Sequence, residues 1–198
     1  MATQLQIYNR AAVALGRDPV FSDPARVASR NPTGQALASN YAVVLPAAMA
    51  AFPWNFACKR EIIPALATAP RFGWKTAYEA PADLLRVRDL NYVAGGPREK
   101  FAVEGGIILA NCTGSANLRW IARVLDVAKF DAEFVEYFAI RLAASCALKV
   151  LGSQAAEDAL TLQAEKLLVR GRNSDSQEAE PEDDDEDGDW LTFRSSVT

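Results

Sequence analysis

The chain has 198 residues, half of them hydrophobic, and a formal net charge of −4. This length holds one ordinary domain, or one domain with an insertion and a tail, and the composition allows a packed core. There is no histidine, which excludes Ser-His-Asp and Cys-His catalysis and most zinc-enzyme sites. The three cysteines are odd in number and widely spaced, so we expect reduced thiols. No apolar run reaches the ~18 residues of a membrane span, so we expect no membrane partner.

The charge is distributed unevenly along the chain. Ten acidic residues and no basic residue lie between positions 175 and 189. The rest of the chain has 21 basic residues against 15 acidic ones, a net charge of +6. A mildly basic body is therefore followed by a strongly acidic tail, whose composition is typical of solvated segments.

Two helices are predicted before residue 58. The first spans residues 3–15, with Thr3 as its N-cap and Gly16 just after its end. The second begins at Asn31-Pro32, an N-cap followed by proline in the first turn, and runs to residue 52. Pro46 lies inside this pattern and should kink the helix, because proline removes a backbone hydrogen bond.

Between residues 58 and 127 the hydrophobic pattern becomes alternating, which is typical of half-buried strands. Strands are predicted over residues 71–78, 84–90 and 118–125. A hairpin is expected over residues 101–111, turning at Gly105-Gly106. In the last strand, Arg119 and Arg123 share one face and Trp120 lies on the other.

Helical periodicity returns after residue 130. Asp131 is predicted to cap a helix that ends at Gly152, is apolar on most sides, Leu148 included, and lies at the centre of the core. Ser153 caps the next helix, which Gly171 should stop.

The predicted fold class is α+β: a four-helix body with an inserted small antiparallel β-sheet and an extended C-terminal tail. The helical body takes residues 1–57 and 128–172, the inserted β region residues 58–127, and the acidic tail residues 173–198.

Two pairs of carboxylates are candidates for general acid-base chemistry. Glu133 and Glu136 form one pair, and Glu157 and Asp158 form the other. Catalysis needs two carboxylates with unlike environments facing one cleft. These pairs fall in first helical turns, where acids favour the helix dipole, so we expect no enzymatic activity.

The acidic tail resembles a calcium loop over a short stretch only. Asp183, Asp185 and Asp187, followed by Gly188, match the first six positions of an EF-hand loop. The twelfth position, which should be glutamate, is Arg194. We therefore expect no metal and no cofactor, and interpret the run as a solvated or partner-facing segment.

Basic residues are in slight excess in the β region, with ten against seven acidic ones over residues 58–127. No nucleic-acid-binding motif accompanies them, so we expect no sequence-specific recognition of DNA. If many copies of the chain formed a ring, the basic excess of each copy would add up, and even this small excess would matter electrostatically.

Several segments together resemble the tail tubular protein A family of bacteriophage head-to-tail adaptors (connectors). The chain contains a Trp-x-Phe-Ala sequence at Trp54-Asn55-Phe56-Ala57 and a Pro-x-Asp-x-x-Arg-Val sequence at 81–87. The other similar segments are residues 8–16, 103–109 and 130–144. In this order they cover residues 5–172. The continuous second helix expected from the family is interrupted here by Pro46, and the acidic extension has no counterpart in the family pattern.

The resemblance implies a structural component of the virion neck, assembled in the host cytoplasm. Such an adaptor forms a ring of twelve copies beneath the portal protein and carries the tail nozzle, or tubular protein. Genomic DNA passes non-specifically through its centre.

We expect the acidic tail to bind another subunit. Asp183, Asp184 and Asp185 would pair with a basic surface of an adjacent adaptor copy or of the portal. The apolar residues Trp190, Leu191 and Phe193 would fill pockets there or add a strand to a sheet edge.

A second interpretation comes from a different class of protein. The chain would then be a small soluble binding or regulatory module, whose acidic tail mimics nucleic acid and masks a basic partner. An enzyme that uses only carboxylates ranks far below both. An adaptor would form a high-order ring with its portal, whereas a binding module would be a monomer or dimer.

Overall fold

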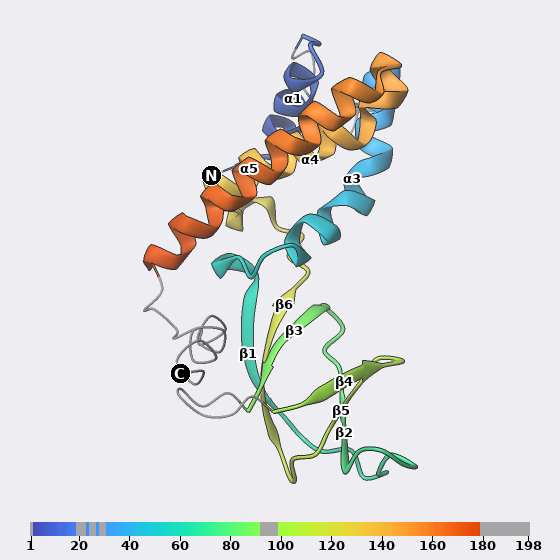
Figure 1. The fold of residues 1–198 in the computed structure, drawn as a ribbon, viewed down its shortest axis with the longest axis vertical. Coiled ribbons are helices and arrows are strands. Elements are labelled where there is room, and N and C mark those ends of the chain that lie inside the picture. Colours follow the sequence, from blue (N-terminus) through green and yellow to red (C-terminus); the bar gives the residue numbers. More distant parts are fainter. Residues whose placement is uncertain (1, 19–22, 24–26, 28–30, 92–98, 179–198) are drawn as a thin grey trace, which may run out of the picture.

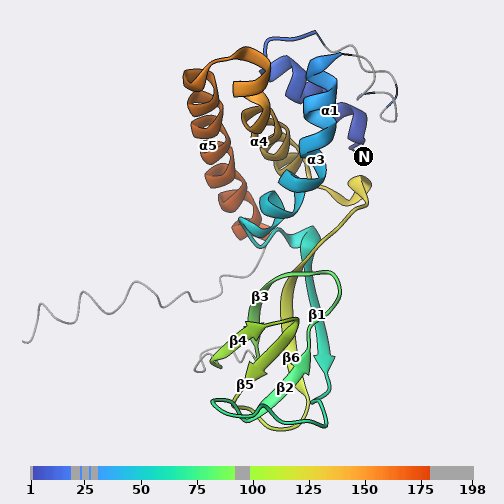
Figure 2. The ribbon, with the colours of Figure 1, turned by 90° about the vertical axis from the view of Figure 1, so that its right-hand side faces the viewer.

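A computed structural model of the chain describes residues 2–18, 23, 27, 31–91 and 99–178. The molecule is elongated, with a helical body at one end and a β region at the other (Figures 1 and 2). The β region is inserted between the second and third long helices of the described part. The predicted α+β class, with a sheet region inserted into a helical body, is confirmed.

The helical body is organised around one central helix. It consists of α1 (Gln4–Ala14), α3 (Pro32–Ala50), α4 (Ala132–Leu151) and α5 (Gln154–Glu178). Helix α4 contacts all the others, with α5 on one side of it and α1 and α3 on the other (Figure 2). The central position predicted for α4 is confirmed.

Side-chain hydrogen bonds determine where the helices begin. Thr3, Asn31 and Asp131 each accept a bond from the amide three residues further along, at 3.3, 2.7 and 2.7 Å. Ser153 caps α5 in the same way, at 3.2 Å. Gly152 ends α4 with a φ of +66°, a conformation that costs glycine little. All four predicted N-caps and this C-terminal glycine are confirmed.

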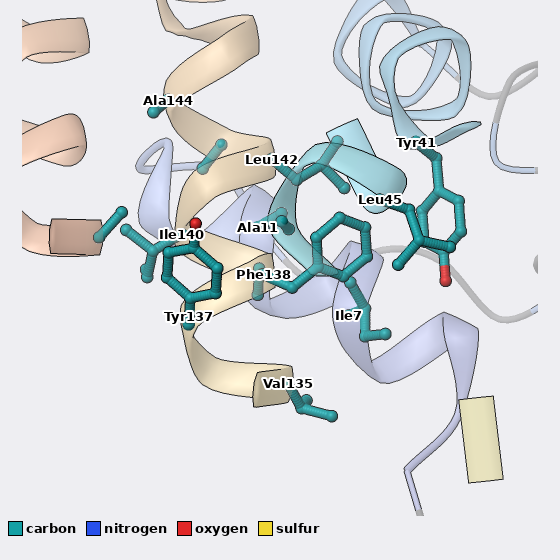
Figure 3. Close-up of a cluster of buried hydrophobic side chains, with 14 of the residues drawn as sticks. Ile7, Ala11, Tyr41, Leu45, Val135, Tyr137, Phe138, Ile140, Leu142 and Ala144 are labelled. Carbon is teal, nitrogen blue, oxygen red and sulfur yellow. The ribbon is translucent and has the colours of Figure 1, made fainter. Parts of the chain in front are cut away.

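Apolar side chains from three helices meet in the centre of the body (Figure 3). Phe138 and Leu142 of α4 are fully buried beside Ile7 and Ala11 of α1 and Leu45 of α3. Burying a side chain of this size contributes roughly 1.5–3 kcal/mol. Leu148, which was predicted to share in this packing, is 51% exposed, because it lies on the far side of α4 near its end.

The β region contains two small antiparallel sheets where one was predicted. The first has the order β1 (Cys58–Ile63), β6 (Ala116–Ala122), β3 (Leu84–Leu90). The second has the order β2 (Thr76–Glu79), β5 (Ile107–Ala110), β4 (Phe101–Glu104). Tyr78 and Ile108 of one sheet share a buried cluster with Leu118 and Trp120 of the other. Each sheet therefore covers the apolar face of its partner.

The hairpin and one of the three strands were predicted correctly, and the other two strands only in part. The strand predicted over residues 118–125 is β6, which spans Ala116–Ala122. Gly105 and Gly106 turn the β4–β5 hairpin with φ values of +56° and +79°, and β3 has the predicted bounds. The strand predicted over residues 71–78 begins only at Thr76. Gly73 has a φ of +79°, which no strand accommodates, and Phe72 is 87% exposed. The alternation of apolar residues before Thr76 was therefore misleading.

Helix α5 corrects the predicted end of the body. Gly171 does not stop the helix, which continues to Glu178. Residues 173–178 consequently belong to α5 rather than to the extended tail. Gly171 faces Trp54: a Cβ added there would lie 2.8 Å from Cη2 of the indole. The glycine is needed for a close approach between α5 and Trp54, not for a turn.

This contact gives a first prediction. Gly171→Ala should lower the free energy of unfolding by about 1–3 kcal/mol, because the added methyl collides with a fully buried indole. Helix propensity alone predicts the opposite, a gain of about 1 kcal/mol. Urea denaturation of both proteins would measure the difference.

The control uses the other partner of the contact. Trp54→Phe removes the indole atoms nearest Gly171, so Gly171→Ala should cost at least about 1 kcal/mol less in that background. A stabilising Gly171→Ala in the wild-type chain would contradict the close approach.

Candidate functional site

The residues predicted to bind a partner lie outside the described part of the chain. Trp190, Leu191 and Phe193, as well as Asp183, Asp184 and Asp185, all fall within residues 179–198. Their role therefore stays a prediction, and the described surface has to supply the candidate site.

The carboxylates at the start of α4 lie among arginines. Glu136 accepts a hydrogen bond from Arg10 at 2.8 Å, and both side chains are partly exposed. Together with Glu133 and Arg170 they line a shallow pocket of about 210 Å³. Two bases balance two acids there. In the described ranges, no three potential ligands come together in a way that would hold a metal ion.

A cluster of arginines lies on the outer face of the first sheet. Arg60 of β1 is directly opposite Arg119 of β6, and Arg119 is opposite Asp89 of β3. Arg86 of β3 pairs with Ile121 of β6, two residues after Arg119, and Ile121 is buried against the helical body. Side chains in register on neighbouring strands project to the same face. We call the surface made by Arg60, Arg86, Arg88, Arg119 and Asp89 the arginine face.

Asp89 anchors the centre of the arginine face. Its Oδ2 lies 3.6 Å from Nε of Arg119 and 3.8 Å from Nε of Arg88. Asp89 and Arg119 are each only 9% exposed. A charge this deeply buried is tolerated when it is paired. Two of the four arginines are thus held by one carboxylate, and the face keeps a positive excess.

The rim of the arginine face is open to solvent. Arg60 and Arg86 are exposed and form no ion pair with any other residue of the described ranges. Ile62, two residues after Arg60 on the same strand, is 68% exposed. A shallow pocket of about 320 Å³ includes Arg60, Ile62 and Arg119 in its lining, together with the carboxylate of Glu61. The surface therefore offers a ligand exposed guanidinium groups next to an apolar contact.

The opposite face of the same sheet holds a hydrogen-bonded carboxylate. Asp83, just before β3, accepts a charged hydrogen bond from Lys59 of β1. Its other oxygen accepts from Nε1 of Trp120 at 3.2 Å. The bond from Lys59 is the largest cause that lowers the pKa of Asp83 below its ordinary value, and the bond from Trp120 adds to it. This network ties all three strands together.

Sequence reasoning did not identify the arginine face. Arg119 was correctly placed on the opposite face of its strand from Trp120, but its pairing with Asp89 joins strands about 30 residues apart in sequence. Register irregularities in β3 next to Arg86 and Asp89 also break the simple alternation. The feature of the sequence that could have indicated the arginine face is the recurrence of arginine, at residues 60, 86, 88 and 119, in three short strands.

Comparisons with known proteins do not narrow the function. No model of a protein family and no curated protein sequence matches the chain. Among the described helices, none is both long enough and apolar enough to cross a membrane.

The network around Asp83 gives a second prediction. Because its pKa is lowered in the folded state, Asp83 stabilises the fold at pH values above its unfolded pKa. That contribution is lost as the pH falls through the lower, folded pKa. Asp83→Asn should cost about 0.5–1.5 kcal/mol of unfolding free energy at pH 7. The difference from wild type should shrink as the pH is lowered from about 5 to about 2.

Thermal or urea denaturation across this pH range measures both effects. Glu104→Gln, an exposed carboxylate of β4, is the matched control and should change stability at pH 7 by less than about 0.5 kcal/mol. A constant difference between wild type and Asp83→Asn at all pH values would show that the charge of Asp83 does not stabilise the sheet.

Proposed function

We propose that the chain is a structural subunit of a bacteriophage neck, a head-to-tail adaptor that acts as a ring. The observation that carries the proposal is exposed apolar residues on two helices, α3 and α5, that α4 separates within one helical body. The family resemblance of the sequence supplies the setting, and these two flanks supply a physical reason for ring formation.

The first flank, which we call the α3 flank, is centred on Val43, which is 73% exposed. The second, the α5 flank, is formed by Leu162 and Val169, which are 53% and 56% exposed. These two residues are seven positions apart and so lie on one face of α5. Helix α4 lies between α3 and α5, so the two flanks are on helices at different sides of α4 (Figure 2).

Two different flanks favour a head-to-tail arrangement of copies. A two-fold dimer needs a single patch that is complementary to itself, whereas a head-to-tail contact joins one patch to a different one. If the α3 flank of each copy packs on the α5 flank of the next, the assembly closes into a ring when the rotation between copies allows it. The resemblance implies twelve copies.

The β region suits the second task of an adaptor. It projects from one end of the helical body (Figures 1 and 2). In a ring whose bodies pack side by side, all β regions would emerge on the same rim. There they would be available to the portal protein or to the tail nozzle, with DNA passing non-specifically through the centre. The proposed location is the virion neck, after assembly in the host cytoplasm.

The experiment that tests the proposal introduces a charge into each flank separately. Val43→Glu and Leu162→Glu should each abolish ring formation in the presence of the portal protein of the same phage, because each buries an unpaired carboxylate in one contact. Mixing the two variants should restore exactly one contact, between the intact α5 flank of the first and the intact α3 flank of the second. The mixture should therefore stop at heterodimers, which light scattering coupled to size-exclusion chromatography detects.

Val103→Glu is the matched control. Val103 is 45% exposed but lies in β4, away from both flanks, so this variant should form rings as wild type does. Normal rings from either flank variant, or failure of only one of them, would contradict head-to-tail packing through these flanks.

A further inference from the structure

The arginine face keeps a positive excess, because its four arginines outnumber Asp89 and Glu61, which lines the same pocket as Arg60. Four arginines surround a single aspartate, and Arg60 and Arg86 are exposed. The exposed Ile62 lies beside Arg60 in the same pocket. A ligand that matches this surface is anionic over several residues and carries an apolar group at one end.

The same chain contains a segment with this chemistry. Residues 180–189 include eight acidic side chains and no basic one. Trp190 and Leu191 follow directly after the last acid, Asp189. The segment therefore combines a run of carboxylates with a terminal apolar group, which is the complement of the arginine face.

The end of α5 brings this segment close to the sheet. Gly171 of α5 is packed against Trp54, which lies only four residues before the start of β1 at Cys58. In both views the C-terminal end of α5 lies at the end of the helical body nearest β1 (Figures 1 and 2). The eleven residues that follow Glu178 can span up to about 36–40 Å, whereas the six residues of β1 span about 20 Å. The segment is therefore longer than β1, the strand that carries Arg60 and Ile62.

We propose that the acidic segment of residues 180–189 docks on the arginine face of its own chain, with Trp190 or Leu191 placed against Ile62. Tethering gives the segment an effective concentration in the millimolar range, which favours this contact over one with a free ligand. Duplex DNA also carries negative charge, but its phosphates offer no apolar partner for Ile62. The docked segment keeps the arginines of the unassembled protein away from nucleic acid. In the unassembled protein this contact takes the place of the contact with another subunit that the sequence predicts, and it does not depend on the proposed role in a phage neck.

The test compares full-length proteins by NMR, following the backbone amides of Arg60, Ile62 and Arg86. In the amide variant, six acids are neutralised: Glu182→Gln, Asp183→Asn, Asp184→Asn, Asp185→Asn, Glu186→Gln and Asp187→Asn. Neutralisation should shift these amide signals at about 50 mM salt and much less at about 1 M salt, where charges are screened within about 3 Å. The shifts should not change on tenfold dilution, because the contact lies within one chain.

Two pairs of charge reversals provide matched backgrounds. In the Arg60→Glu/Arg86→Glu background, neutralising the segment should change the amide signal of Ile62 at least fivefold less than it does in the wild-type background. In Arg141→Glu/Lys166→Glu, which changes the charge equally on exposed positions of the helical body, the shift should be retained. The proposal would be overturned if the amide signals of Arg60, Ile62 and Arg86 were the same in the wild type and the amide variant. It would also be overturned if the shift of Ile62 survived in Arg60→Glu/Arg86→Glu. Shifts that disappear on dilution would place the segment on another copy and overturn it as well.

A labelled DNA duplex tests the competing occupant. The amide variant should bind it about tenfold more tightly than wild type at about 50 mM salt, because its arginine face is no longer covered. Measurable and equal affinities of the two proteins would assign the face to DNA and overturn the proposal.

Discussion

The packing of the Trp54 indole joins three helices at the point where the chain enters the β region. The side chain is fully buried, its ring lies 5.2 Å from that of Phe134 on α4, and its far edge faces Gly171 on α5. Trp54 also stands between the end of α3 and the start of β1. One residue therefore couples three helices to the first strand of the β region.

The sequence predicted features whose causes are local. Helix starts at Thr3, Asn31 and Asp131 depend on a side chain and an amide three residues away, so they can be recognised without knowledge of the fold. Gly171 was interpreted as the end of the last helix, because a glycine at the end of an apolar stripe is typical of a helix C-terminus. The glycine is instead required by the close approach of an indole more than a hundred residues away in sequence. The pairing of Asp89 with Arg119 likewise joins residues that are far apart in sequence. The arginine face could not be predicted, because strand order and register are set by tertiary packing.

The described surface separates two kinds of interaction. The apolar flanks on α3 and α5 are suited to contacts between helical bodies, which are short-range and insensitive to salt. The arginine face of the β region is suited to an anionic ligand, and its interactions weaken with salt. The alternative view of the chain, a regulator with an acidic tail that mimics nucleic acid, uses only the second surface and gives the apolar flanks no role. The two views therefore differ in what they require of the helical body.

The central claim, that copies pack head to tail into a ring, is tested most directly by electron cryomicroscopy of the full-length protein bound to the portal of the same phage. We expect closed rings, of the twelve copies that the family resemblance implies, with the α3 flank of each copy against the α5 flank of the next and the β regions on one rim. One or two copies per portal, or copies related by two-fold axes through a single flank, would contradict it.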